Sequence, residues 1–391
     1  MKRENTGKYV VISTIGEKVN AYIPAPLPPH PLPELSAAGN KLLMSSVRAL
    51  GALDALGEHL PDVAPFIYAY IRKEAVYSSM IEGTQSSLSD LLLYEQGGYE
   101  RNNTDDVEEV SHYVSAMQLG MARMQEGYPI SLRLIKELHA ELLRRGRGAT
   151  KMPGEFRQSQ NWIGGTRPGN AVYVPPPPQD LMDCLGALEL FINRDDALSP
   201  LVKAALVHVQ FESIHPFLDG NGRVGRLLIQ MMLCNSGLLK KPLLYLSLYF
   251  KQHRQEYYRL LNGIRQDGNW EAWIEFFLDA VQYTASDAVS VLTELQRSVD
   301  HDKAIIATFG RMRKNAEKVL STMQRHIVTR PLILARQIGI APSTIYRVLD
   351  KLEEHGIVLQ NTQGERNRLY TYSAYQSMLG ESSRLHLTQR N

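Results

Sequence analysis

Apolar side chains recur at helical spacing along most of this 391-residue chain. Intervals of three and four residues place such side chains on one face of an α-helix, and a polar or Pro/Gly stretch ends each segment. The face formed by Leu132, Ile135, Leu138 and Leu142 is one example. On this pattern we predict helices at 35–60, 65–79, 105–124, 131–145, 180–193, 200–214, 252–264 and 270–295, with one more beginning after the glycines at 220 and 222.

Two stretches lack this helical spacing. The segment Pro24–Leu35 is rich in proline, which has no N–H to donate and cannot continue a helix, so we expect an extended arm lying along the body. Further on, Gly164–Gly165 and Pro168–Gly169 are turn signals between two β-prone runs within residues 158–174. The pattern therefore predicts a mainly α fold with a single β-hairpin.

A different pattern begins at residue 313, where a helical segment is followed by a helix–turn–helix stretch and two strand-like runs. This order resembles a winged helix-turn-helix domain, with Ala335 and Ile338 packing its first helix and Gly339 forming the turn. Ser343 would cap the second helix. In such domains the second helix enters the major groove of DNA, which here would use Ser343, Thr344, Tyr346 and Arg347, while a wing-like loop would hold Gly364, Arg366 and Arg368.

Charge separates this C-terminal part from the rest. The chain has a formal net charge of +2, but residues 300–391 contain 14 Lys and Arg against 8 Asp and Glu, a net of +6. A basic unit beside an acidic remainder favours nucleic-acid contact, although winged helices also dock proteins or form homodimers. The length predicts two or three domains. We divide the chain into an N-terminal arm (1–34), a helical region (35–125), a core (126–285), a connecting helix (286–312) and a winged helix (313–391).

Composition narrows the class of protein. Hydrophobic residues make up 44% and charged residues 21% of the chain, which excludes a disordered or collagen-like protein. Cys184 and Cys234 are too few for a disulfide or metal framework. No apolar run approaches the about 18 residues of a membrane-spanning helix, and the N-terminus lacks the apolar core of a signal peptide. We therefore expect a cytoplasmic protein without membrane contact.

The most informative chemical pattern is HPFLDGNGRVGR, which begins at His215. The GNG turn at 220–222 tolerates unusual backbone angles, and such a turn before a helix directs successive N–H groups at an anion. Arg223 and Arg226 share one face of the following helix and can donate to phosphates. Asp219 offers an oxygen ligand for Mg²⁺, and His215 can act as a base near neutral pH. Together they predict a site for nucleotidyl or phosphoryl transfer.

This segment resembles the signature of the Fic family, His-x-Phe-x-Asp/Glu-Gly-Asn-Gly-Arg-x-x-Arg. The resemblance extends over roughly residues 35–285. It implies an all-helical catalytic core that transfers AMP from ATP to a Ser, Thr or Tyr hydroxyl of a target protein, this chain itself included, and releases pyrophosphate. The residues that match the fixed positions are His215, Phe217, Asp219, Gly220, Asn221, Gly222, Arg223 and Arg226.

The resemblance also assigns roles. His215 would take the proton from the target hydroxyl, whose oxygen attacks the α-phosphorus, and Asp219 would hold Mg²⁺ between the α- and β-phosphates. Phe217 would only pack in the core. A phosphorylating branch has lysine in place of Gly222, so the glycine favours adenylylation. The other phosphate contacts would come from Gly220, Asn221 and Gly222 at the α- and β-phosphates, Arg223 at the β-phosphate and Arg226 at the γ-phosphate.

The predicted hairpin resembles the flap of the family, whose free strand edge would hold a target segment by main-chain pairing. On the same resemblance Val172 and Tyr173 would contact ATP, and Tyr257 and Tyr258 would border the adenine. Aromatic residues at helical spacing are also common in cores, so both readings of the two tyrosines stay open. Where some relatives have asparagine, this chain has Arg265.

A segment ahead of the core matches a second feature of the family. Ser78 and Glu82 share a helix face, and Gly83 ends that helix. The arrangement resembles the family's inhibitory helix, in which Glu82 would pair with Arg226 and displace the γ-phosphate of bound ATP. The same glutamate could instead position water to remove AMP from a target.

A second function from another class also stays open. The chain could be a DNA-binding regulator whose Fic body senses nucleotides.

Overall fold

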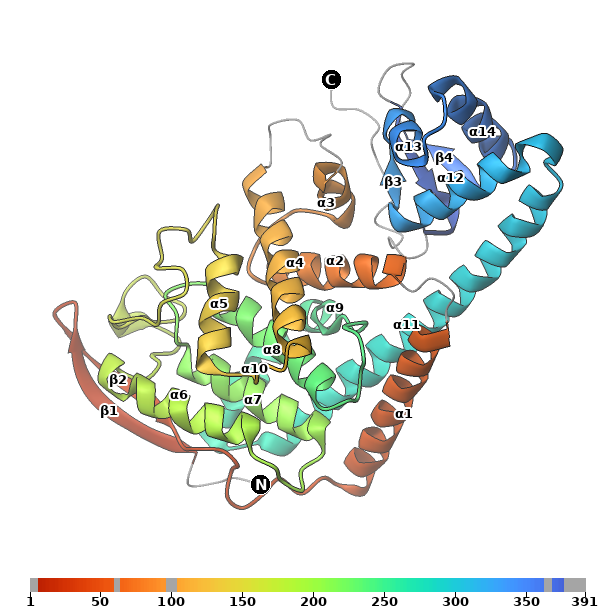
Figure 1. Ribbon diagram of the computed structural model, residues 1–391. Coiled ribbons are helices and arrows are strands. Elements are labelled where there is room, and N and C mark those ends of the chain that lie inside the picture. The colour runs from red at the N-terminus through yellow and green to blue at the C-terminus, as the bar shows by residue number, and fades with distance from the viewer. Residues whose placement is uncertain (1–5, 60–63, 96–103, 362–367, 376–391) are drawn as a thin grey trace.

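The structure is a computed structural model that describes residues 6–59, 64–95, 104–361 and 368–375. Most of it is helical, and nearly every helix predicted from apolar spacing is present (Figure 1). The helices of the body are α1 (Ala37–His59), α2 (Ala64–Ile81), α3 (Leu88–Glu95), α4 (Thr104–Gln125), α5 (Leu132–Leu142), α6 (Pro178–Asn193), α7 (Pro200–Ile214), α8 (Asn221–Asn235), α9 (Leu246–Gln252), α10 (Arg254–Asp267) and α11 (Trp270–Ala307).

Helices α7 and α8 form the centre of the body. Both are apolar and buried on nearly all sides, which is typical of a helix enclosed by others rather than lying at a surface. They pack against each other, with α2, α4, α5 and α6 around them, while α1 lies along α11. The loop that carries the HPFLDGNGR segment joins α7 to α8 and is therefore held by the most buried part of the molecule.

The N-terminal arm differs from the prediction. Strands β1 (Gly7–Thr14) and β2 (Glu17–Pro24) pair antiparallel, from Gly7 opposite Pro24 to Thr14 opposite Glu17. Ile15 and Gly16 connect them with φ values of 51° and 76°, as in a two-residue type I′ turn. The predicted extended arm (1–34) was therefore wrong for residues 7–24, which form a second hairpin beside the one predicted at 158–174. The proline-rich segment that follows does lack helix and strand up to α1, as predicted.

The predicted flap hairpin is much smaller than expected. Within residues 158–174 a single bridge pairs Ile163 with Tyr173, through N–H···O=C bonds of 2.8 and 3.1 Å, and a 3₁₀ turn spans Pro168–Asn170. Pro168 and the four prolines at 175–178 have no N–H, so a longer ladder cannot form on this side of the loop. We keep the name flap for residues 158–174.

The C-terminal part contains the predicted order of helices and strands. Gly339 makes the turn between α13 and α14 with a φ of 72°. The expected Ser343 cap is wrong, because Pro342 is the first helical residue and Ala341 precedes it. Gly364 and Arg366 lie outside the described residues. The elements are α12 (Arg313–Arg325), β3 (Val328–Thr329), α13 (Pro331–Ile338), α14 (Pro342–Glu354), β4 (Val358–Gln360) and β5 (Tyr370–Tyr372), with antiparallel sheet order β3-β5-β4.

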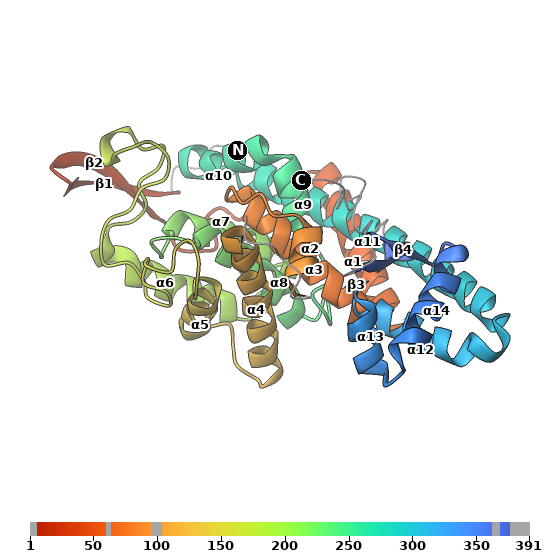
Figure 2. The same cartoon turned by 90° about the horizontal axis from the view of Figure 1, so that it is seen from above.

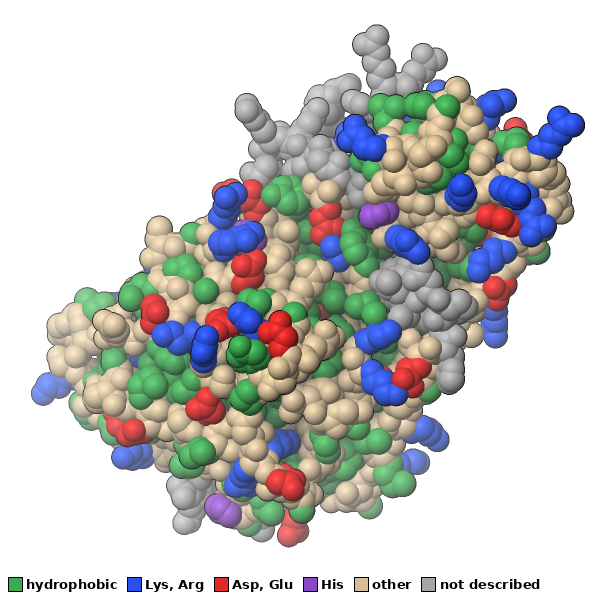
Figure 3. Space-filling model, in the orientation of Figure 1, with side chains coloured by type: hydrophobic (Ala, Val, Ile, Leu, Met, Phe, Trp, Pro, Cys, Tyr) green, Lys and Arg blue, Asp and Glu red, His purple; other side chains and the backbone are tan. Residues whose placement is uncertain are grey.

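One long helix joins the two parts. The predicted helix at 270–295 and the predicted connecting helix at 286–312 form one continuous helix, α11, which ends at Ala307 and leads to the C-terminal unit (Figure 2). On the face seen in Figure 3, lysine and arginine predominate over that unit, whereas both signs of charge are mixed over the body. Within the described parts of the chain, every helix is too short or too polar to cross a membrane.

Candidate active site

His215 stands at the carboxyl end of α7 in a left-handed conformation, with φ 49° and ψ 61°. This region is unfavourable for a residue with a Cβ, so surrounding contacts must stabilise it. Arg157 supplies them: its Nε donates to the carbonyl oxygen of His215 at 3.0 Å, and its backbone N–H donates to that of Pro216 at 2.9 Å. The arginine therefore stabilises the unfavourable backbone conformation of His215.

Burial sets the protonation state of this histidine. It lowers the pKa of His215 to about 4, with a further contribution from the charge of Arg157. The imidazole is thus neutral at pH 7 and can accept a proton. Its Nδ1 lies 4.0 Å from the Glu212 carboxylate, whose own pKa burial raises to about 7.

The loop after His215 is closed by Asn221. Its side-chain oxygen accepts from the backbone N–H of Phe217 at 2.8 Å, and its nitrogen donates to the carbonyl of Phe217 at 2.8 Å. Phe217 is fully buried, as predicted. Because both ends of the Asn221 amide are engaged, the predicted phosphate contact of this residue would have to use its backbone N–H. Gly220, with a φ of 78°, precedes the first residue of α8.

His139 supports the same loop from α5. Its ring stacks on Phe217 with centroids 3.7 Å apart. Nδ1 accepts from the N–H of Gly154 at 2.9 Å, so Nε2 carries the proton and donates to the carbonyl of Asp219 at 3.0 Å. Burial lowers the pKa of His139 to about 4. The neutral ring therefore serves as a fixed bridge between α5 and the loop.

Asp219 is the candidate metal ligand. Its Oδ1 accepts from the N–H of Gly220 at 2.7 Å, whereas no hydrogen bond among the described residues engages Oδ2. About a third of the side chain (34%) is exposed. A partly exposed carboxylate with one oxygen free of hydrogen bonds fits Mg²⁺, which takes one or two carboxylates and completes its shell with phosphate and water. The described residues contain no group of three or more His, Cys, Asp or Glu that could hold a metal alone.

Arg223 is enclosed between two acids. Its Nη1 lies 2.6 Å from Oε1 of Glu109, and its Nη2 lies 3.5 Å from Oδ1 of Asp219. The guanidinium of Arg223 is fully buried. Its predicted contact with the β-phosphate would therefore have to form alongside its contacts with Glu109 and Asp219. Burial raises the pKa of Glu109, although Arg223 and Arg147 act in the opposite direction.

Arg226 is held by the end of α2. Its Nε donates to Oγ of Ser78 at 2.8 Å, and its Nη2 donates to the carbonyl of Ser78 at 2.9 Å and to Oε1 of Glu82 at 2.6 Å. The predicted Glu82–Arg226 contact is thus confirmed. Burial alone would raise the pKa of Glu82, but Arg226 outweighs it and the pKa is lowered. Gly83 follows with a φ of 104°.

Gly222 makes this contact possible. A Cβ at this position would lie 2.2 Å from Oε1 of Glu82 and 3.0 Å from Nη1 of Arg226. Real Cβ atoms do not approach other atoms so closely, so any side chain here would displace the carboxylate. The sequence pattern predicted unusual backbone angles for the GNG turn, but only Gly220 has a positive φ, whereas Gly222 lies within helix α8. Glycine at 222 instead allows the close approach of Glu82.

Two segments of the chain match known family domains. Residues 129–233 match the Fic/DOC family, and residues 40–122 match the Fic/DOC family N-terminal domain. The chain therefore contains a Fic/DOC domain and a Fic/DOC N-terminal domain. Among curated relatives, protein adenylyltransferase Fic of Drosophila virilis is 29% identical over 265 residues (66% of this chain, 50% of the relative), and that of Aedes aegypti is 30% identical over 237 residues (59% and 44%). The chain spans about half the length of these relatives.

Solved Fic structures share the fold. A Fic family protein from Desulfovibrio desulfuricans G20 superposes with a TM-score of 0.57 at 19% identity, covering 87% of this chain and 97% of that chain. Fic-1 from C. elegans (residues 134–508) gives a TM-score of 0.53 at 20% identity, covering 66% and 73%. At this identity the likeness concerns the fold alone.

The residues expected around the nucleotide fall into two groups in this structure. Tyr257 is buried, and its hydroxyl lies 2.8 Å from Nε2 of His208, so it belongs to the core. Tyr173 is also buried and donates to the carbonyl of Ser213 at 2.6 Å. Val172 and Tyr258 are exposed and free to meet a ligand. The structure therefore brings together the phosphate-side residues, whereas the adenine side stays a prediction.

Arg157, His139 and Glu109 were missed by the sequence interpretation. Each contacts the signature loop or its arginines from a distant part of the chain. His139 did leave a signal, since it lies on the apolar face of the 131–145 helix beside Leu138. A polar ring on such a face needs a buried partner. Nothing in the local sequence marks Arg157 or Glu109.

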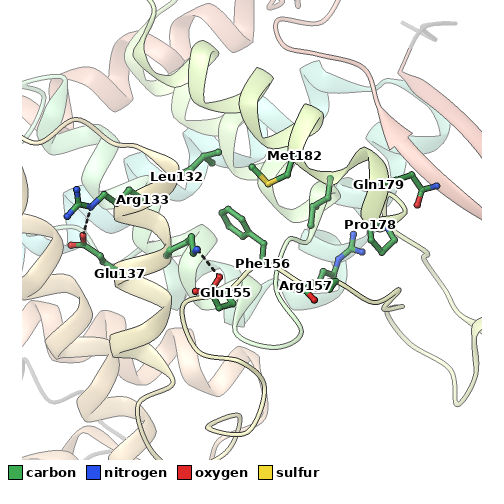
Figure 4. Close-up of a pocket in the computed structure, with 12 residues that line it drawn as sticks. Leu132, Arg133, Glu137, Glu155, Phe156, Arg157, Pro178, Gln179 and Met182 are labelled. Atoms are coloured by element: carbon green, nitrogen blue, oxygen red, sulfur yellow. Dashed lines mark hydrogen bonds and ion pairs between the residues drawn. The ribbon is translucent and has the colours of Figure 1, made fainter.

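An open groove of about 890 Å³ lies beside the base of the flap (Figure 4). It runs between α5 and α6, with Phe156 in its middle and the Lys136–Glu155 ion pair (2.8 Å) along one side. Of the signature residues, none lines it. Arg157 does, on the opposite side from its bond to His215.

The predicted DNA-contact residues lie on α14. Ser343 and Arg347 are exposed, whereas Thr344 and Tyr346 are half-buried. DNA binding by this unit stays a prediction.

Proposed function

We propose that this chain transfers AMP from ATP to a hydroxyl group of a protein side chain and releases pyrophosphate. The observation that carries the proposal is the placement of a neutral His215 just ahead of the N-terminus of α8, with Arg226 one turn further along. The amino end of a helix carries partial positive charge and free N–H groups, which suits the phosphates of ATP. The names of the curated relatives, protein adenylyltransferase Fic, support the same reaction.

In the proposed reaction His215 accepts the proton of the target hydroxyl. Nδ1 is buried beside Glu212, which leaves Nε2 as the accepting atom. The hydroxyl oxygen forms a bond to the α-phosphorus, the bond from this phosphorus to the oxygen bridging to the β-phosphate breaks, and pyrophosphate leaves. Arg157 holds the backbone of His215 in place through its bond to the carbonyl oxygen.

The N–H groups of residues 220–222 and the positive end of α8 would bind the α- and β-phosphates. Asp219 would hold Mg²⁺ through its free Oδ2. When bound, this ion would neutralise charge on the phosphates and on the departing pyrophosphate. His139 keeps Asp219 at the required position through the backbone contact described above.

We also propose that the structure represents an inhibited state. Arg226 is the residue expected at the γ-phosphate, and here its guanidinium is used by Glu82 and Ser78. ATP can reach this arginine only after the carboxylate of Glu82 leaves. Glu82 and the γ-phosphate are both anions, so they compete for one cation.

Intact-mass spectrometry tests the reaction. The Glu82→Gly form is incubated with ATP, Mg²⁺ and a cell lysate, and the protein itself and the lysate proteins are then analysed. An adduct with the mass of AMP is expected. An adduct with the mass of phosphate, or none, would overturn the proposal, and loss of AMP from a previously modified protein would favour the reverse reaction.

A further inference from the structure

A second hydrophobic cluster, separate from the main core, joins the N-terminal hairpin (residues 7–24) to the flap. Val19 and Ala21 of β2 are buried against Val174 of the flap. Figure 2 shows the hairpin beside the flap at one end of the molecule. Four partly buried side chains complete the cluster: Val10, Ile12, Trp162 and Ala171. Since its members come from these two segments alone, the cluster serves their mutual attachment.

A carboxylate fixes the tip of the flap. Glu17, the first residue of β2, forms an ion pair with Arg167 and accepts from the N–H of Gly169 at 2.7 Å. The hydrogen bonds from Arg167 and Gly169 lower the pKa of Glu17. A Cβ at Gly169 would lie 2.6 Å from Oε2 of Glu17, so glycine is needed for this approach.

One edge of the flap is also closed by the hairpin. The N–H of Tyr22 donates to the carbonyl of Val174 at 2.9 Å, and the Tyr22 and Tyr173 rings lie 6.2 Å apart. On its inner side Tyr173 pairs with Ile163. An added strand therefore cannot use the carbonyl of Val174, because β2 already bonds to it.

The opposite edge is free. Within the part of the chain that the structure describes, no hydrogen bond uses the backbone N–H or C=O of Trp162. The neighbouring Asn161 donates from Nδ2 to the carbonyl of Phe217 at 3.0 Å, which ties this edge to the loop that begins at His215. An extended chain paired at Trp162 would run beside that loop.

We propose that the N-terminal hairpin, with Glu17 as a positioning residue, holds the flap in the conformation that receives the target protein and directs an extended target segment to the edge at Trp162. The proposal rests on the transfer reaction proposed above. Main-chain pairing to a free strand edge needs an edge of fixed shape, and a loop with one internal bridge has little stability of its own. The hairpin provides the missing support.

Hydrogen exchange measures the attachment directly. In the Glu17→Gln form the amide hydrogens of residues 163, 172 and 173 should exchange about two- to fivefold faster than in the parent, as for loss of an exposed charged contact. Glu317→Gln is the matched control, because it removes an exposed carboxylate paired with Arg313 in α12, far from the flap. Equal exchange in all three proteins would overturn the proposal.

The rate of AMP transfer provides the second readout. For this assay Glu17→Gln and the control Glu317→Gln are each introduced into the Glu82→Gly form. Glu17→Gln should reduce AMP incorporation into lysate proteins severalfold while leaving ATP affinity, measured by calorimetry, unchanged. Reversing both charges (Glu17→Arg with Arg167→Glu) should restore part of the loss. Unchanged or increased incorporation would contradict the proposal. If Glu82→Gly itself transfers no AMP, the proposed reaction fails, and hydrogen exchange alone then decides whether the hairpin holds the flap.

Discussion

Replacing Glu82 with glycine removes one of three hydrogen bonds that hold Arg226. The bonds to Oγ and to the carbonyl of Ser78 remain, whereas the charged contact of 2.6 Å to Glu82 is lost. A hydrogen bond to a charged group contributes about 1.5–3 kcal/mol. Because 30% of the Glu82 side chain is exposed, we take the lower part of this range, about 1.5–2 kcal/mol. The fraction of molecules with Arg226 free for ATP should then rise about 10- to 30-fold.

The assay is the initial rate of AMP incorporation from labelled ATP, at one acceptor concentration and saturating Mg²⁺. Glu82→Gln keeps the size of the side chain without its charge, so its rate should lie between those of the parent and Glu82→Gly. Glu126→Gly is the control, since Glu126 also directly follows a helix and pairs with an arginine (3.2 Å from Arg123) away from the site. The reasoning is refuted if Glu82→Gly is no faster than the parent, or if Glu126→Gly is accelerated equally.

Three further substitutions or conditions test other parts of the site. His215→Ala should abolish incorporation while calorimetry still detects ATP binding, and retained transfer would contradict its role as base. The neutral imidazole of His215 is the active form, and its pKa is lowered to about 4. The kcat/KM of the Glu82→Gly form should therefore stay level as pH falls from 7 to about 5.5 and decline only as pH approaches 4. A midpoint near the ordinary pKa of 6.5 would contradict the burial argument. Gly222→Ala should displace the Glu82 side chain in a crystal structure, and an unmoved Glu82–Arg226 contact would refute the steric argument.

The helices could be predicted because apolar spacing is a local property. The helix predicted at 105–124 is Thr104–Gln125, and that at 35–60 is Ala37–His59. The sequence was divided into a helix ending at 295 and a connecting helix at 286–312, whereas the structure has one continuous helix to Ala307. Few apolar residues follow Leu295, and Val299 and Ile306 become buried only through contacts with other elements. Local pattern therefore locates an element but does not show how far tertiary contacts extend it.

The N-terminal hairpin was missed for a different reason. Two-residue turns with positive φ at both positions favour Asn-Gly or Asp-Gly, whereas this turn is Ile15–Gly16. A β-branched residue at a φ of 51° is unfavourable by itself. The turn is held by the pairing of the strands and by their attachment to the flap, which are long-range contacts that the turn residues do not reveal.

In the candidate site, too, the features set by local sequence could be predicted and those set by long-range contacts could not. The signature between His215 and Arg226 is contiguous, so residue types and spacing were enough to predict a site for nucleotidyl or phosphoryl transfer there. Its supporting residues come from other elements: His139 from α5, Arg157 from the start of the flap and Glu109 from α4. Their roles depend on which elements pack together, and their residue types alone fit an ordinary surface or core position equally well.

The inhibitory contact follows from the same physics as the predicted ATP site. The carboxylate of Glu82 lies against the first turn of α8, where the Cβ of any residue at 222 would meet it. That position is the positive end of a helix beside Arg226, so it stabilises any anion, whether a carboxylate of this chain or a phosphate of ATP. The proposed inhibition therefore needs no site of its own. The glycine that would give phosphates access to the backbone N–H groups gives the same access to Glu82, and the carboxylate that follows α2 is held there by the cation that the γ-phosphate would need.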